Sequence, residues 1–189
     1  LTLTYNKKIS DKHTLDVVAG TEFYRNYSIG GSVEGRLFPS DDFTYIGSAG
    51  IVDDGSSFKS PPHSILSFFC EARYDYEDRI LVTASIRTDG SSNFGANNRF
   101  GYFPAISAAW RVSQEKFFHS NFVDDLKVRG SFGLTGNERI GGFLFLGQWG
   151  SSTYSGNSGV VPTSVANPNI KWETTTEKNL GVDVAMWSG

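Results

Sequence analysis

The feature of this sequence that most constrains its fold is a long alternation of apolar and polar side chains between Ser64 and Tyr76. Every second residue belongs to an apolar set, which comprises Leu66, Phe68, Cys70, Ala72, Tyr74 and Tyr76. The residues between them are mostly polar and comprise Ser67, Phe69, Glu71, Arg73 and Asp75. Because successive side chains of a β-strand point to opposite faces, this period of two indicates a strand with two unlike faces. Such a strand would be about twice as long as an average strand of a soluble protein.

Similar alternations recur along the chain and predict an all-β fold. We expect strands at residues 1–9, 13–24, 64–76, 80–89, 101–112, 125–135 and 171–187. In an antiparallel up-and-down meander, alternate connections lie at opposite ends of the sheet. The connections at one end would then be short (10–12, 77–79 and 113–124), and those at the other end would be long (25–63, 90–100 and 136–170). Transmembrane β-barrels have this asymmetry, with short periplasmic turns and longer extracellular loops.

The residue types on the two predicted faces favour the same interpretation. We expect lipid contacts from an apolar set that includes Leu66, Phe68, Ala72, Val82, Ala84 and Ile86. The lumen-facing set should include Glu71, Arg73, Thr83, Arg87 and Arg129. Aromatic residues near the strand ends of the apolar face would form a membrane girdle, namely Tyr5, Phe23, Tyr74, Tyr76, Tyr102, Trp110, Trp172 and Trp187.

The number of strands indicates that the chain is one part of a larger barrel. Bacterial antiparallel barrels have an even number of strands, so seven strands cannot close by themselves. The sequence also opens on a strand-like alternation, and we expect both of its ends to be cut from a longer polypeptide. No uncharged segment is suitable for a transmembrane helix, and we expect no signal peptide.

Composition narrows the possible functions. The formal net charge is −3, so no basic patch supports binding to nucleic acid. The single cysteine, Cys70, excludes a disulfide framework within the chain. The histidines are scattered singly, and no nucleophile or phosphate-binding motif is present, so we expect no catalytic residue, no metal, no cofactor and no enzyme activity. The pairs Asp41-Asp42 and Asp53-Asp54 do not match an EF-hand and are interpreted as solubilising loop charge rather than a calcium site.

Three stretches carry a resemblance to a known family. They are Arg87–Gly95 continuing through Asn98–Arg111, with the sequence RTDGSSNFG and then NRFGYFPAISAAWR; Leu126–Asn137, with LKVRGSFGLTGN; and Asn167–Asp183, with NPNIKWETTTEKNLGVD. In order and spacing they resemble signature strands of the SusC/RagA family of TonB-dependent outer-membrane receptors of Bacteroidetes. The matches cover most of residues 80–183, and residues 1–79 fit the family with lower specificity.

The resemblance implies a barrel of about 22 strands, a size class in which the lumen is plugged. Residues 1–189 would be part of its β-barrel domain, without the N-terminal plug. Such receptors import oligosaccharides or peptides across the outer membrane, with a SusD-like surface lipoprotein and energy supplied through TonB. The expected partners are therefore outer-membrane lipid, a SusD-like lipoprotein, TonB and the cargo.

The long connection at 136–170 is the candidate cargo site. It has no charged residue from Ile140 to Ile170, and it contains Trp149 and Tyr154 among hydroxyl and amide side chains. Aromatic faces with such neighbours suit a neutral glycan, so we expect an oligosaccharide rather than a peptide. A packed loop or a lid-protein contact is the alternative, and Phe143–Leu146 could form a short strand. In a different class of function, the chain would be a soluble β-sandwich carbohydrate-binding module.

Overall fold

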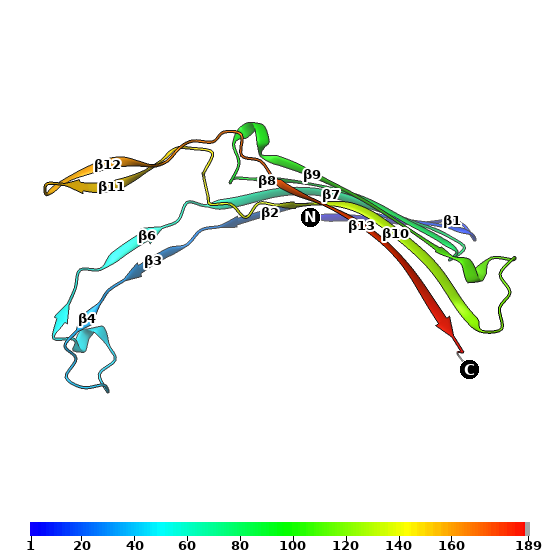
Figure 1. Cartoon of the computed structure of the whole chain (residues 1–189), viewed down its shortest axis with the longest axis horizontal. Helices are drawn as coiled ribbons and strands as arrows, with labels where there is room; N and C mark the ends of the chain where they lie inside the picture. The colour runs from blue at the N-terminus through cyan, green and yellow to red at the C-terminus, as the bar shows by residue number, and fades with distance from the viewer. Residues whose placement is uncertain (188–189) are drawn as a thin grey trace. The chain divides into compact units, whose positions relative to one another are not determined.

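The computed structural model describes residues 1–187, which fall into two compact units. Of the described residues, one unit comprises 1–24 and 65–187, and the other comprises Arg25–Ser64. The first unit contains a seven-stranded antiparallel sheet in the order β1-β2-β7-β8-β9-β10-β13 (Figure 1). Its strands are β1 (Thr2–Ser10), β2 (His13–Asn26), β7 (His63–Tyr76), β8 (Ile80–Ser91), β9 (Phe100–Arg111), β10 (Val123–Asn137) and β13 (Glu173–Met186).

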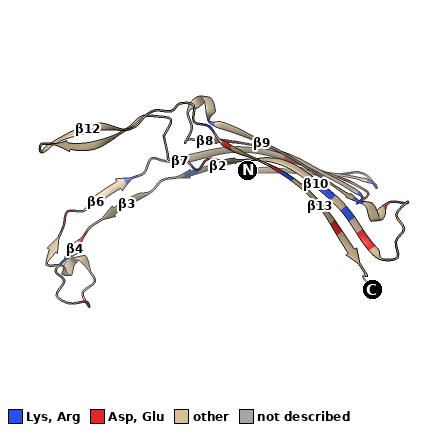
Figure 2. Cartoon of the chain, in the orientation of Figure 1, with Lys and Arg blue, Asp and Glu red and all other residues tan. Residues whose placement is uncertain are grey.

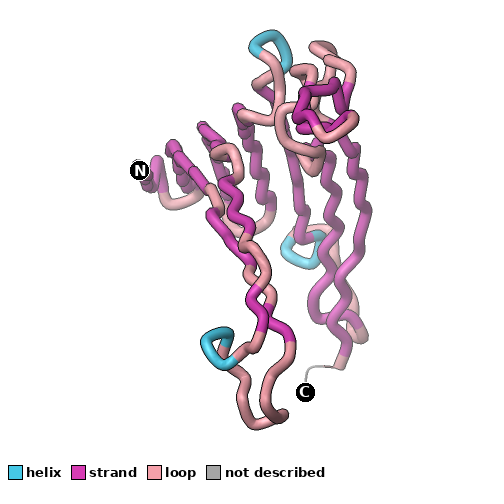
Figure 3. The backbone as a smooth tube through the Cα atoms, turned by 90° about the vertical axis from the view of Figure 1, so that its left-hand side faces the viewer, coloured by secondary structure: helices cyan, strands magenta, loops and turns pink. Residues whose placement is uncertain are grey.

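The predicted meander is confirmed strand by strand. Each of the seven expected strands corresponds to one strand of the sheet. Within the sheet, each of these strands lies beside the expected strand that precedes it in the sequence and the one that follows it. The strands are 9 to 15 residues long, as the extended alternation predicts. Figure 3 shows them as a single layer. No strand end differs from the predicted bounds by more than two residues: β10 extends two residues further in each direction, β2 and β8 end two residues later, and β13 begins at Glu173 rather than at residue 171.

The pairing registers align like residues in rows across the sheet. One row on the apolar face runs through Tyr76, Ile80, Trp110, Val128 and Val182. A row on the opposite, polar face runs through Arg73, Thr83, Ser107, Ser131 and Asn179. Because the side-chain period is two, one register thus places every apolar set on one face and every polar set on the other.

The apolar face is not covered by other described residues. Ile86, Ile106 and Val182 are 50%, 53% and 60% exposed, although all three lie within long strands of the sheet. The buried hydrophobic residues of the described chain are only Phe94 and Phe103. A soluble sheet buries one apolar face against a second layer, so this face needs an apolar environment from outside the described chain.

The small core lies at the long-connection end of the sheet. The Phe94 side chain is fully buried, and its ring centroid lies 5.2 Å from that of Trp172. The ring centroid of Phe103, on the polar face, lies 5.3 Å from that of the same indole in a T-shaped arrangement. The ring of Phe103 lies so close to Gly101 and Gly136 that a Cβ at either position would approach it to 2.4 or 2.1 Å. These two positions therefore need glycine because the backbone and the ring approach closely.

The expected place of Trp172 in the apolar girdle is wrong. This residue precedes β13, and its ring packs against Phe94 and Phe103 rather than continuing the alternation of the strand. Its Nε1–H donates to the carbonyl oxygen of Arg99 at 3.0 Å. Trp172 is therefore part of the small core, held by one hydrogen bond and two ring contacts.

The long connections contain short strands that the alternation did not predict. In residues 136–170, β11 (Gln148–Tyr154) and β12 (Asn157–Ser164) form a hairpin. Residues Phe143–Leu146, which could have been a strand, form turns instead. In the separate 25–64 unit, two strand pairs form: β3 (Ile29–Ser32) pairs with β6 (Ser56–Lys59), and β4 (Gly35–Arg36) pairs with β5 (Ile51–Val52).

Helical structure among the described residues is limited to three 3₁₀ turns. They are η1 (Ile46–Ser48), η2 (Ala96–Asn98) and η3 (Val112–Gln114), each of three residues. No helix in the part of the chain that the structure describes has the length and apolar composition needed to cross a membrane.

Candidate functional site

On the polar face, Arg87 of β8 is the centre of a group of interacting charged and polar side chains. The guanidinium Nε of Arg87 lies 2.8 and 2.9 Å from the two carboxylate oxygens of Asp89. Its Nη2 donates to Ser67 Oγ at 2.9 Å and lies 3.4 Å from Glu22 Oε2. The same guanidinium lies over the ring of Phe69 at 5.9 Å. Because these partners come from β2, β7 and β8, Arg87 ties three strands together on one face.

A second group of charges lies along β10 and β13 (Figure 2), and the strand registers place it on the same face. Asp183 Oδ2 is 2.9 Å from Lys127 Nζ, and Asp183 Oδ1 is 3.3 Å from Arg129 Nε. On β7, Arg73 Nε donates to Glu71 Oε1 at 2.7 Å. All of these pairs are partly solvent-exposed, so their net contribution to stability is small and they chiefly set the charge of this face.

Small side chains separate the two charged groups and leave shallow hollows. Two adjoining cavities of about 330 and 320 Å³ share Thr83, Ser107, Ser131 and Asn179 in their walls. Arg129 lines the first cavity, whereas Glu71 and Glu177 line the second. The polar face therefore contains a shallow groove with an uncharged floor and charged borders, which suits contact with a polar surface or a hydrated solute.

The structure places the four predicted lumen residues on this polar face. Glu71 and Arg73 lie on β7, Arg87 lies on β8 and Arg129 lies on β10, and of these Glu71 and Arg129 line the groove. Among the described residues, no group of three His, Cys, Asp or Glu side chains is placed to hold a metal ion. In the 25–64 unit, Asp53 instead pairs with Arg36 at 2.7 Å.

The two aromatic residues of the candidate cargo site are not brought together. Trp149 and Tyr154 both lie on β11 and are 69% and 87% exposed. They are an odd number of residues apart in a regularly paired segment, so their side chains point to opposite faces of the β11–β12 hairpin. Each face of the hairpin thus presents one ring, and the pair does not form one stacking platform.

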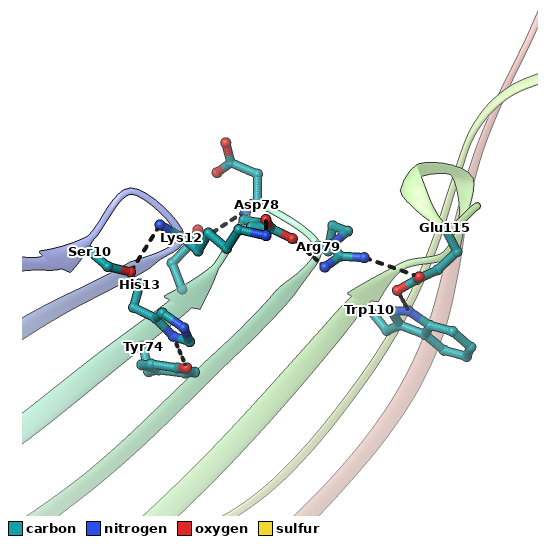
Figure 4. Close-up of polar contacts among 10 residues, drawn as sticks. Ser10, Lys12, His13, Tyr74, Asp78, Arg79, Trp110 and Glu115 are labelled. Atoms are coloured by element: carbon teal, nitrogen blue, oxygen red, sulfur yellow. Dashed lines mark hydrogen bonds and ion pairs between the residues drawn. The ribbon is translucent and has the colours of Figure 1, made fainter.

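A chain of polar contacts across the short connections was not predicted (Figure 4). Lys12 Nζ, in the β1–β2 turn, lies 2.7 Å from Glu77 Oε1 in the β7–β8 turn. Glu77 also pairs with Arg79, and Arg79 Nη1 reaches Glu115 Oε2 beyond β9 at 3.3 Å. Glu115 Oε1 accepts the Nε1–H of Trp110 at 3.1 Å. We name these five residues the turn chain.

Two members of the turn chain, Glu77 and Lys12, have shifted pKa values. The hydrogen bond from Lys12, assisted by the charge of Arg79, lowers the pKa of Glu77. The same hydrogen bond, with the negative charge of Glu77, raises the pKa of Lys12. The sequence signal for the turn chain was a charged residue in each of the three short connections. Only the folded meander brings these three connections side by side.

Comparisons with known proteins define the class of this protein. The family model for TonB dependent receptor-like β-barrels matches residues 2–189. A TonB-dependent receptor of Formosa agariphila is 35% identical over 188 residues, which cover 97% of this chain and 18% of that protein. The TonB-dependent receptor SusC of Bacteroides thetaiotaomicron is 33% identical over 140 residues, which cover 67% of this chain and 14% of SusC. The chain thus belongs to the TonB-dependent receptor-like β-barrel family.

Solved structures locate the chain more closely within that class. The structure of the RagAB peptide transporter matches with a TM-score of 0.83 and 25% identity, over 98% of this chain and 21% of that one. The RagAB peptide importer in its open-open state matches with a TM-score of 0.81 and 26% identity. Together with SusC, these matches confirm the resemblance to SusC/RagA receptors and the all-β barrel fold. The chain spans about a fifth of the length of the relatives it matches.

Proposed function

We propose that residues 1–189 are a seven-stranded segment of a larger outer-membrane barrel, of about 22 strands, in a TonB-dependent nutrient importer. The observation that carries this proposal is the uncovered apolar face, whose mid-strand residues Ile86, Ile106 and Val182 are half exposed or more. Lipid acyl chains would cover that face in a membrane barrel. A soluble β-sandwich would bury this face against a second sheet, whereas Ile86, Ile106 and Val182 remain exposed.

In this proposal the polar face forms part of the lumen wall. Glu71, Arg73, Arg87 and Arg129 would face a plug domain or the hydrated cargo path, and the groove lined by Thr83 and Ser107 would leave room beside them. TonB would supply energy through parts of the receptor outside residues 1–189. A SusD-like surface lipoprotein would cover the long-connection end, and the relatives named as receptors support transport rather than enzyme activity.

The proposed cargo is an oligosaccharide, with a peptide as the second candidate. The charge-free segment Ile140–Ile170 and the exposed rings of Trp149 and Tyr154 favour sugar contacts, which need no ion pair. The second candidate is favoured by the RagAB neighbours, which are described as a peptide transporter and a peptide importer. The acidic residues of the separate 25–64 unit would suit a basic peptide.

Two measurements on the full-length receptor test these proposals. Recovery in the outer-membrane fraction, resistant to extraction by carbonate, is expected for the barrel, whereas a soluble product would contradict it. For the cargo, W149A and Y154A are each compared with the matched hairpin variant V160A while uptake of labelled glycans and peptides is measured. Loss of glycan uptake in the aromatic variants alone supports an oligosaccharide, and loss of peptide uptake with normal glycan uptake reverses the assignment.

A further inference from the structure

The loop between β9 and β10 contains phenylalanines that the barrel strands do not explain. Among residues 115–122, which we name the rim loop, Phe117 and Phe122 are 66% and 65% exposed, whereas Phe118 is half-buried. A short turn facing water has no need for two large exposed aromatic side chains. Their exposure therefore points to a surface that covers them.

The rim loop continues the apolar face beyond the end of β9. Trp110 lies on that face opposite Ile80 and Val128, and the ring centroid of Phe117 is 6.2 Å from that of Trp110. The last described pair between β9 and β10 joins Arg111 to Lys127. Past that pair, β10 runs on with β13 alone, and the apolar pair Val123–Met186 lies directly after Phe122.

Hydrogen bonds hold the rim loop in a defined conformation. The amide of Phe118 donates to the carbonyl oxygen of Glu115 at 3.0 Å, and the amides of Phe122 and Val123 donate to Ser120 Oγ at 3.2 and 3.0 Å. The carboxylate of Glu115 is neutralised by Arg79 and also accepts the indole N–H of Trp110. Phe117 and Phe122 thus belong to a loop whose backbone is held by hydrogen bonds.

The charge of the rim loop identifies the surface it fits. With Glu115 paired, Lys116 is left exposed beside Phe117, and it forms no ion pair with any carboxylate of the described residues. Aromatic rings next to a lysine match the boundary between acyl chains and phosphate headgroups, where rings enter the apolar layer and the ammonium group meets phosphate. A protein partner would not need this continuity with the apolar face.

We propose that the rim loop is a membrane-interface anchor, in which Phe117 and Phe122 insert at the headgroup boundary of the periplasmic leaflet and Lys116 contacts phospholipid phosphate. This inference rests on the proposed membrane barrel. The anchor extends the apolar band from the strands onto a periplasmic connection and fixes the depth of that end of the barrel. The turn chain, through Glu115 and Trp110, orients the anchor toward the membrane rather than the periplasm.

The test measures membrane depth in the full-length receptor. Single cysteines replace Phe117 or Phe122 in a background without other cysteines, and each carries an environment-sensitive fluorophore. The receptor is reconstituted in phosphatidylcholine vesicles with nitroxides placed near the headgroups or near the chain ends. The matched control is D11C in the β1–β2 turn, a fully exposed site at the same end of the sheet. I106C and S107C report the apolar and polar faces at mid-strand.

The anchor predicts loss of fluorescence at F117C and F122C with the headgroup nitroxides and a smaller loss with the deep ones. I106C should lose fluorescence mainly with the deep nitroxides, and D11C and S107C with neither. Unquenched F117C and F122C beside a quenched I106C would overturn the anchor and leave the barrel intact. An unquenched I106C would overturn the proposed barrel, and with it the anchor. Quenching of D11C equal to that of F117C would also overturn the anchor, because the label itself would then be entering the membrane.

Discussion

Replacement of Phe94 by alanine should increase the local unfolding of residues 138–172, which the small core holds in place. Among residues 1–187, Phe94 is the one large hydrophobic side chain with no exposed surface, and it contacts Trp172, which precedes β13. Replacing a buried phenylalanine by alanine costs roughly 3–5 kcal/mol through lost contacts and the cavity that remains. At 1.4 kcal/mol for each factor of ten, the local opening equilibrium of residues 138–172 should rise roughly 100- to 4,000-fold.

Hydrogen exchange of the full-length F94A receptor measures this opening. The amides of Asn167 and Ile170, which donate to Leu144 and Asn167 carbonyls, should lose protection. The matched control is F68A, because Phe68 is 46% exposed on the apolar face of β7. F68A should leave exchange in residues 138–172 unchanged. A change below about tenfold in F94A would mean that the core does not hold the segment, since it implies less than about 1.4 kcal/mol.

Two other predictions concern the turn chain and the isolated chain. Because the folded pKa of Glu77 lies below its ordinary value of 4.5 and that of Lys12 above 10.5, their pair contributes fully between those pH values. Its contribution is lost as pH falls through the folded pKa of Glu77 or rises through that of Lys12. In the E77Q receptor, the melting temperature should therefore depend less on pH at both the acid and the alkaline end. An unchanged dependence of the melting temperature on pH would contradict the pairing. Residues 1–189 expressed alone should aggregate without detergent, because two sheet edges and the apolar face meet water. A monodisperse, cooperatively unfolding monomer in sedimentation and melting experiments would contradict the fragment interpretation.

The strands were predictable because alternation is a local property of the sequence. Thr83 and Ala84 are adjacent, yet their side-chain types alone assign them to opposite faces, and the registers agree. The position of Glu71, Arg73, Arg87 and Arg129 on the polar face followed from the same pattern. Trp172 was misplaced because the last strand begins after the Asn167–Asn169 turn, and ring packing with Phe94 sets the direction of the indole.

The remaining features depend on contacts between distant parts of the chain. The β11–β12 hairpin was missed because its residues are mostly exposed on both faces, so no alternation marks it. The turn chain joins Lys12 to Glu115 through residues that are far apart in sequence. Only the completed meander brings these turns together, and a single sequence carries no signal for that distance.

The central claim is that one face of this sheet contacts lipid and the other does not. The most direct test compares A84R with T83R in the full-length receptor, folded into vesicles and titrated with denaturant. Ala84 is exposed on the apolar face opposite Ile106, whereas Thr83 lines the groove with Glu71 and Glu177. An arginine near the bilayer midplane should lower the free energy of unfolding by roughly 2–4 kcal/mol in A84R, and T83R should remain close to the parent receptor. Equal stability of the two variants would contradict the assignment of the apolar face to lipid.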